Sequence, residues 1–222
     1  MANRRDDVSA MAWAARLGLI GALLVGADAL GAAKPLTDPK PEANARQFKH
    51  RGFTVDISGL ADDPRKADLT KALAAQIDAV AKVGLKPDVI AFFQSLELKV
   101  EPHLKGFLGT YKDGVINLAP WQLDTHDPTL LHEFLHALHA KRLPQGYDNA
   151  EIIAFFKDAA GHPRYEGTNS SYFLTNNREF FAVTATVYLS GSLPYNRPYS
   201  RNAVKAAQPS YYGFLEKLFG AR

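Results

Sequence analysis

The sequence predicts an α+β fold that is mainly helical, with a small mixed or antiparallel sheet over one central helix. Three observations lead to this prediction. Apolar residues recur at helical spacing in several segments, short alternating stretches lie between them, and an Asp-Gly pair separates two of those stretches. Turn-forming residues divide the segments, as is typical of elements that pack around a shared core.

The composition is that of an ordinary globular protein. The 222 residues are 46% hydrophobic and 22% charged, with a net charge of +3. The basic residues are scattered rather than gathered in a stripe, so nucleic acid is not an expected partner. The chain contains no Cys, which excludes disulfides and thiolate ligands and leaves His and carboxylates to hold any metal.

The first 33 residues have the pattern of a secretory signal peptide. Three arginines, Arg4, Arg5 and Arg16, precede an uncharged run at 17–27, and small residues follow up to Ala33. A run of this length is shorter than the roughly 20 apolar residues that span a bilayer, so stable membrane insertion is not expected. The sequence therefore predicts export, with the mature protein secreted or held in the periplasm or cell envelope.

The rest of the chain is expected to form a linker and one domain. Residues 34–46 contain three prolines and no apolar periodicity, which indicates a linker. Residues 47–222 are expected to fold as a single domain with an N-terminal part at 47–125 and a C-terminal part at 126–222. We expect the domain to act as a monomer.

Alternation and turn signals predict the elements of the N-terminal part. The Asp113-Gly114 pair favours a hairpin between strands at 109–112 and 115–118. The other expected elements are strands at 53–57 and 96–101, a helix from Asp62-Asp63-Pro64 to Gly84, and a second helix at 87–96.

The second strand of that hairpin is a candidate substrate-binding segment. An edge strand beside a cleft can pair with an extended peptide through its main chain, so Val115, Ile116 and Asn117 are the predicted contacts. The alternative is that 115–118 is a structural edge strand only.

Helices dominate the C-terminal part. Asp127-Pro128 is expected to begin the central helix, which runs to Arg142. Further helices are expected at 149–161, 178–189 and 211–219.

The central helix carries the motif around which the prediction of function is built. His132-Glu133-Phe134-Leu135-His136 places two imidazoles one turn apart on one helical face, with a carboxylate beside them. This H-E-x-x-H arrangement is typical of zincin-like peptidases, in which both His bind zinc and the Glu moves protons. Glu133 is therefore the predicted general base that activates water.

A catalytic zinc site needs a third protein ligand. A third His in the metzincin position is excluded, because Arg142 stands there. His139 lies about 10 Å along the axis from His132, too far for one ion. We expect Glu179, which begins a separate helix before an aromatic pair, although the helix dipole alone could explain an acid there. Glu166, in a Gly-containing loop, is the alternative.

A donor to the developing oxyanion is also needed. Tyr165, Tyr172 and Tyr188 are near Glu179 in the sequence. Tyr172 lies seven residues before Glu179, in a loop that must lead to the ligand helix, and is the preferred candidate. A packed core aromatic is the alternative for each of them.

Together these motifs resemble the catalytic domain of anthrax lethal factor and the wider lethal-factor-like group of metallopeptidases, which includes secreted bacterial Pro-Pro endopeptidases. The resemblance covers about residues 109–219 and implies one zinc ion bound by His132, His136 and Glu179. It also implies that Glu133 is the base and that Tyr172 stabilises the oxyanion. The matching motifs are His132–His136, Tyr172, Thr175-Asn176 and Glu179-Phe180-Phe181-Ala182. The acid that often follows this last motif in the family is replaced by Val183.

The sequence thus predicts an exported, zinc-dependent endopeptidase that acts on a protein or peptide. Three alternatives stay open: a zincin of another family with a different third ligand, a non-catalytic binding protein in which zinc is structural, and a helical interaction protein in which the motif arose by chance.

Overall fold

A computed structural model describes residues 46–104, 108–119, 127–161, 165, 172–193, 198 and 200–222. All of them belong to the second of two compact units, Asp38–Arg222. The predicted signal peptide at 1–33 and all but the last residue of the predicted linker at 34–46 lie outside the described residues.

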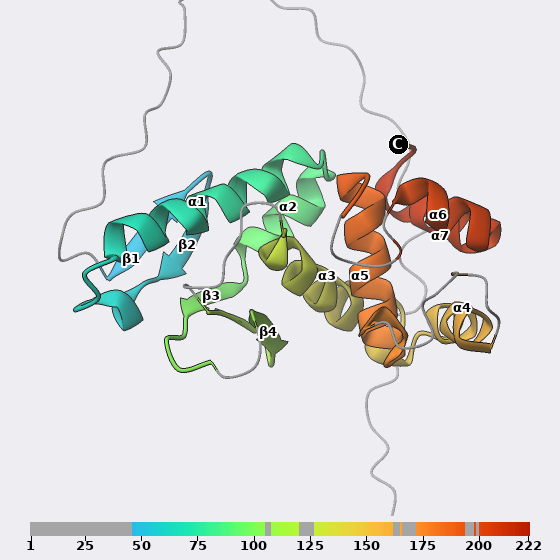
Figure 1. Ribbon diagram of the computed structural model, residues 1–222, viewed down its shortest axis with the longest axis horizontal. Helices are drawn as coiled ribbons and strands as arrows, with labels where there is room; N and C mark the ends of the chain where they lie inside the picture. The colour runs from blue at the N-terminus through green and yellow to red at the C-terminus, as the bar shows by residue number, and fades with distance from the viewer. Residues whose placement is uncertain are drawn as a thin grey trace, which may run out of the picture. The chain divides into compact units, whose positions relative to one another are not determined.

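Five short strands form one mixed sheet (Figure 1). The strands follow one another across the sheet in the order β1-β2-β3-β5-β4. The two outer pairs are antiparallel, whereas β2–β3 and β3–β5 are parallel. Their bounds are β1 Gln47–His50, β2 Phe53–Asp56, β3 Glu97–Val100, β4 Gly109–Lys112 and β5 Val115–Leu118.

Both hairpins turn through residues with positive φ. Asp113 and Gly114, at φ 52° and 88°, join β4 to β5 as the Asp-Gly signal predicts. Arg51 and Gly52, at φ 46° and 79°, join β1 to β2. The sequence analysis did not predict β1, which buries only Phe48.

Seven α-helices are present among the described residues, so the α+β prediction, mainly helical with a small sheet, is confirmed. The helix α6 was not predicted, and α1 begins at Lys66, later than expected. Their bounds are α1 Lys66–Lys82, α2 Pro87–Gln94, α3 Thr129–Arg142, α4 Ala150–Gly161, α5 Asn177–Ser190, α6 Arg201–Ala207 and α7 Pro209–Phe219.

The central helix α3 packs against elements from both parts of the chain (Figure 1). On the side of the sheet, Phe134 stacks on Phe93 with ring centroids 4.5 Å apart and lies 5.5 Å from Phe53. On the other side α3 packs along α5, whose Phe180 and Phe181 are fully buried. Burial of this kind stabilises by roughly 2 kcal/mol or more per aromatic side chain and fixes the axis of the helix that carries the H-E-x-x-H motif.

The start of α3 is capped from another helix. The helix begins at Thr129, directly after the Asp127-Pro128 pair as expected, and its N-cap residue Pro128 provides no side-chain hydrogen bond. Gln76 of α1 does this instead. Its Oε1 accepts from the backbone N–H of Leu130 at 3.1 Å, and its Nε2 donates to the carbonyl of Asp127 at 2.7 Å.

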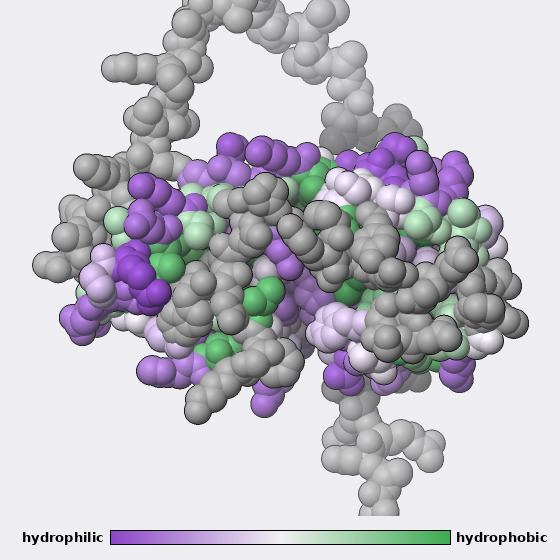
Figure 2. Space-filling model, viewed as in Figure 1, coloured by the Kyte–Doolittle hydropathy of each residue, from purple (hydrophilic) through white to green (hydrophobic). Residues whose placement is uncertain are grey.

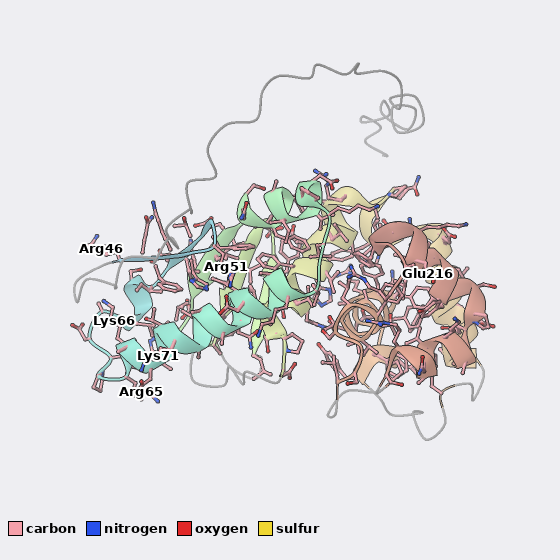
Figure 3. All side chains as sticks on the ribbon, turned by 90° about the horizontal axis from the view of Figure 1, so that it is seen from above. Arg46, Arg51, Arg65, Lys66, Lys71 and Glu216 are labelled. Carbon is pink, nitrogen blue, oxygen red and sulfur yellow. The ribbon has the colours of Figure 1, made fainter. Side chains whose placement is uncertain are left out.

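Hydrophilic residues are prominent on the described surface. The face in Figure 2 is largely hydrophilic where described residues show, with small separated hydrophobic areas. Figure 3 shows several labelled cations around β1, β2 and the first half of α1. Arg51 pairs with Asp78, and Arg65 with Asp63 at 2.9 Å. No helix in the described ranges is both long enough and apolar enough to cross a bilayer.

Candidate metal centre

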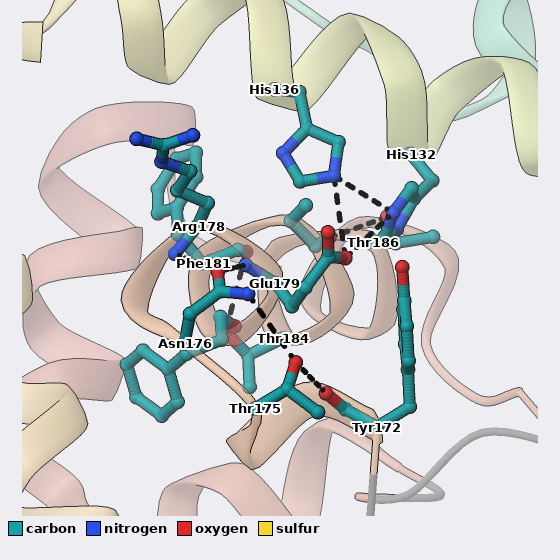
Figure 4. Close-up of polar contacts among 12 residues, drawn as sticks. His132, His136, Tyr172, Thr175, Asn176, Arg178, Glu179, Phe181, Thr184 and Thr186 are labelled. Carbon is teal, nitrogen blue, oxygen red and sulfur yellow. Dashed lines mark hydrogen bonds and ion pairs between the residues drawn. The ribbon is translucent and has the colours of Figure 1, made fainter. Parts of the chain in front are cut away.

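Three side chains from two helices converge on one point (Figure 4). The Nε2 atoms of His132 and His136, one turn apart on α3, are 3.0 Å from each other. The Oε2 atom of Glu179, on α5, lies 3.2 Å from the first and 3.3 Å from the second. The structure therefore brings together the three ligands that the sequence predicts.

Local structure aims Glu179 at the two imidazoles. Asn176 is the N-cap of α5, and its Oδ1 accepts from the backbone N–H groups of Arg178 and Glu179, both at 3.0 Å. The buried Phe180 and Phe181 then fix the helix against the core. Because the cap and the aromatic pair lie on either side of Glu179, its carboxylate has little freedom to leave the cluster.

The geometry of the three atoms fits a tetrahedral metal ion. Metal–ligand bonds of about 2.0–2.1 Å at tetrahedral angles place neighbouring ligand atoms roughly 3.3 Å apart, and the measured separations are 3.0, 3.2 and 3.3 Å. Glu179 Oε2 is also buried without a well-directed hydrogen bond. Such an atom is costly unless something binds it, and the donor set of two imidazoles and a carboxylate suits zinc.

The charges within the cluster support one another. Burial disfavours a charged Glu179, but the facing imidazoles of His132 and His136 lower the pKa of this carboxyl group far below its usual range. Burial likewise disfavours a charged His132, but Glu179, Glu133 and Asp127 together raise the pKa of its imidazole. A divalent cation could replace the proton on these groups and neutralise the same carboxylates.

Glu133 lies beside the cluster in a tight space. Its side chain is buried, with 5% of its surface exposed, and burial raises the pKa of its carboxyl group, although His132 and His136 oppose the rise. A raised pKa suits a group that accepts and returns a proton near neutral pH. The backbone of Tyr111 also lowers this pKa slightly, and the backbone of Gly109 lies against the Glu133 side chain.

Of the three candidate tyrosines, Tyr172 is the one near the cluster. It lies in a single 3-10 turn, η4 (Tyr172–Leu174), and its ring centroid is 6.5 Å from that of His132. Burial, together with the negative charge of Glu179, raises the pKa of its phenol. By contrast, the hydroxyl of Tyr165 donates to Gln208 and that of Tyr188 to the carbonyl of Gly220.

Two other groups considered as ligands are not in the cluster. His139 is fully buried one turn beyond His136, between the rings of Tyr147 and Phe181 at centroid distances of 5.1 and 4.9 Å. Its side chain packs in the core and not in the cluster of candidate ligands. Glu166 lies outside the described residues.

The prediction that residues 115–118 form an edge strand is wrong. β5 lies between β3 and β4, paired to both, so the backbone groups of Val115, Ile116 and Asn117 are engaged by neighbouring strands. Among the described residues no strand pairs with the other side of β4, so β4 has the free edge on this side of the sheet; it also packs on α3. The parallel pairing of β3 with β5 could not be predicted from the hairpin pattern, because β4 lies between these two strands in the sequence.

Sequence reasoning also missed residues around the site. Arg178 lies over the ring of Tyr147 with 4.3 Å between its Cζ and the centroid, and Asn177 donates to the carbonyl of Tyr147 at 2.7 Å. Gly109 was used only to mark the start of a strand. A glycine in a strand pattern often marks a close approach of backbone to another group, and that signal could have identified it.

Comparison with known proteins adds little beyond this geometry. No family model and no curated protein sequence matches the chain. A solved structure that is similar is that of the Pro-Pro endopeptidase PPEP-2 from Paenibacillus alvei, with a TM-score of 0.42 and 21% identity over 74% of this chain and 96% of the other.

Proposed function

We propose that the protein is an exported, zinc-dependent endopeptidase that hydrolyses peptide bonds with metal-activated water. The observation that supports this most is the convergence of His132, His136 and Glu179 beside the buried carboxylate of Glu133. The described residues contribute three ligands to this cluster, and three ligands leave a position open for a reacting molecule, as in catalytic rather than structural zinc sites.

Each side chain has a role that its surroundings support. A zinc ion held by the three ligands would supply a Lewis acid and make water more acidic. Glu133 accepts a proton from the attacking water and returns it to the leaving nitrogen, which its raised pKa favours. Tyr172 keeps its proton because its pKa is raised, so its hydroxyl can donate a hydrogen bond to the developing oxyanion.

The substrate is a protein or peptide that adds to the sheet at β4. This strand has a free edge, packs on α3 and lies next to Glu133. An extended peptide paired with that edge would pass the base and the three ligands. β4 therefore takes the role that the sequence analysis gave to Val115, Ile116 and Asn117.

Cleavage of a peptide library by the purified protein, with and without a chelator, tests the proposal. We expect cleavage that the chelator abolishes and that added zinc restores. The variant Glu133→Gln should lose about 10³-fold in kcat while binding one zinc ion per chain. Glu151→Gln, which changes an exposed acid on α4, is the matched control and should keep full activity.

A second measurement separates the ligands from the base. Glu179→Gln should weaken zinc binding by at least 10-fold, measured by competition with a chelating dye. Zinc affinity unchanged in Glu179→Gln would instead favour a zincin with another third ligand. Zinc binding without cleavage of any peptide would favour the non-catalytic zinc-stabilised protein. N-terminal sequencing of the protein released by the producing cell tests export and cleavage near Ala33.

A further inference from the structure

We propose that Gly109 is a positioning residue for the general base: the missing side chain at the start of β4 leaves the space that the Glu133 carboxylate occupies. This inference rests on the proposed function, because Glu133 acts as a general base only if the chain is a peptidase.

The steric evidence is direct. A Cβ atom built on Gly109 would lie 2.8 Å from Cγ, 3.0 Å from Oε1 and 3.2 Å from Cδ of Glu133. Carbon atoms in contact are normally separated by about 3.5–4.0 Å, so alanine and the present position of Glu133 exclude each other. The φ of Gly109 is not in the left-handed region, so glycine is needed here for space and not for backbone conformation.

The direction in which the β4 backbone groups point relates this space to the free edge of the sheet. The N–H of Ala119 donates to the carbonyl of Leu108 at 2.9 Å, so 108 and 119 form a hydrogen-bonded pair. Because such pairs alternate along antiparallel strands, the backbone groups of Gly109 and Tyr111 face away from β5, towards the free edge. The N–H of Tyr111 therefore points away from β5, and this backbone group lowers the pKa of the Glu133 carboxyl group.

Glu133 is thus placed beside β4. Gly109 provides the space for its side chain, and the backbone of Tyr111 lowers the pKa of its carboxyl group. The outward groups of Gly109 remain at the same edge that a peptide would pair with. One short segment of β4 therefore sets both the position of the base and the line along which substrate lies.

Gly109→Ala should impair the reaction without impairing binding of metal. Displacement of the base by about 1 Å is expected to lower kcat about 100-fold, with KM within about 3-fold and zinc stoichiometry unchanged. The matched control is Gly213→Ala on α7, where a Cβ would meet nothing within 4 Å; its kcat should stay within about 2-fold of wild type. A kcat of Gly109→Ala within 3-fold of wild type would overturn the proposal.

A thermal double-mutant cycle on the metal-free protein provides a readout besides activity. Gly109→Ala should lower Tm by roughly 3–10 °C in the wild-type background. In the Glu133→Ala background the clashing atoms are gone, so the same change should leave Tm unchanged or raise it, because alanine suits a strand better than glycine. Equal losses of Tm in both backgrounds would show that the space is not made for Glu133.

The outcomes separate this inference from the function on which it rests. If the wild-type chain cleaves no peptide, the proposed function fails and the inference fails with it. If wild type cleaves and Gly109→Ala cleaves equally well, only the inference fails. Should Gly109→Ala not fold, the double variant decides: folding of Gly109→Ala/Glu133→Ala supports the proposal, and its failure to fold overturns it.

Discussion

Substitution of the buried His139 by Leu is expected to stabilise the protein, and to do so most at acidic pH. Both ring nitrogens of His139 are buried without a hydrogen-bond partner. Each such group costs about 1–3 kcal/mol, which gives roughly 2–6 kcal/mol for the pair. Loss of the ring contacts with Tyr147 and Phe181 costs about 0.5–1.5 kcal/mol each. The net expected gain near neutral pH is therefore about 2 kcal/mol.

The pH dependence follows from the same burial. Burial, with smaller contributions from the positive charges of His136 and Arg178, lowers the pKa of His139 from 6.5 to about 4. The unfolded chain therefore binds this proton between pH 6.5 and about 4 while the folded protein does not, so wild type loses stability as the pH falls through that range. At about 1.4 kcal/mol per pH unit, the loss reaches roughly 2 kcal/mol at pH 5.

Urea denaturation of the metal-free proteins at pH 7.5 and pH 5.0 measures both effects. The advantage of His139→Leu over wild type should grow from about 2 kcal/mol at the higher pH to roughly 4 kcal/mol at the lower one. Groups common to the two proteins cancel in this difference. The control His103→Leu changes an exposed His and should shift stability by less than about 0.5 kcal/mol at either pH. An advantage that stays constant or shrinks between the two pH values would refute the reasoning.

Three further outcomes are expected. Asn176→Ala removes the cap of α5 and should lower the free energy of unfolding by about 1 kcal/mol; an unchanged urea midpoint would contradict this. Tyr172→Phe should lower kcat about 100-fold or more with zinc content unchanged, whereas a kcat equal to wild type would remove Tyr172 from the reaction. Zinc at 1,000 times its Kd should stabilise the protein by about 4 kcal/mol, and Glu179→Gln should lose most of that gain when Tm is measured with and without zinc.

Local pattern explains which parts of the fold could be predicted from the sequence. Helical periodicity and an Asn cap identified α5, and Asp113-Gly114 identified the β4–β5 hairpin. In both cases the determining interactions lie within a few residues. β1 and α6 were missed because each is short and buries few residues, Phe48 and Val204 respectively.

In the candidate site, too, the features with a local sequence signal could be predicted and those that depend on tertiary packing could not. His132 and His136 can be recognised from spacing on one helix, and Glu179 from its place at a helix start, once α3 and α5 are assumed to pack. The order of β5 and β4 in the sheet depends on pairing with β3, which no local signal encodes. The space at Gly109 depends on how a strand and a helix approach each other, and only coordinates reveal it.

Gln76 ties the start of the metal-binding helix to a helix far upstream in the chain. Its buried amide bonds to residues 51 and 54 positions away in the sequence, so this cap of α3 forms only after α1 has docked. Contacts of such long sequence separation form late in folding. A fragment of residues 126–222 keeps every candidate ligand, yet is expected to bind zinc poorly. On the proposed function, a newly made chain would accordingly stay inert until the whole unit has assembled, which delays any proteolysis until after folding.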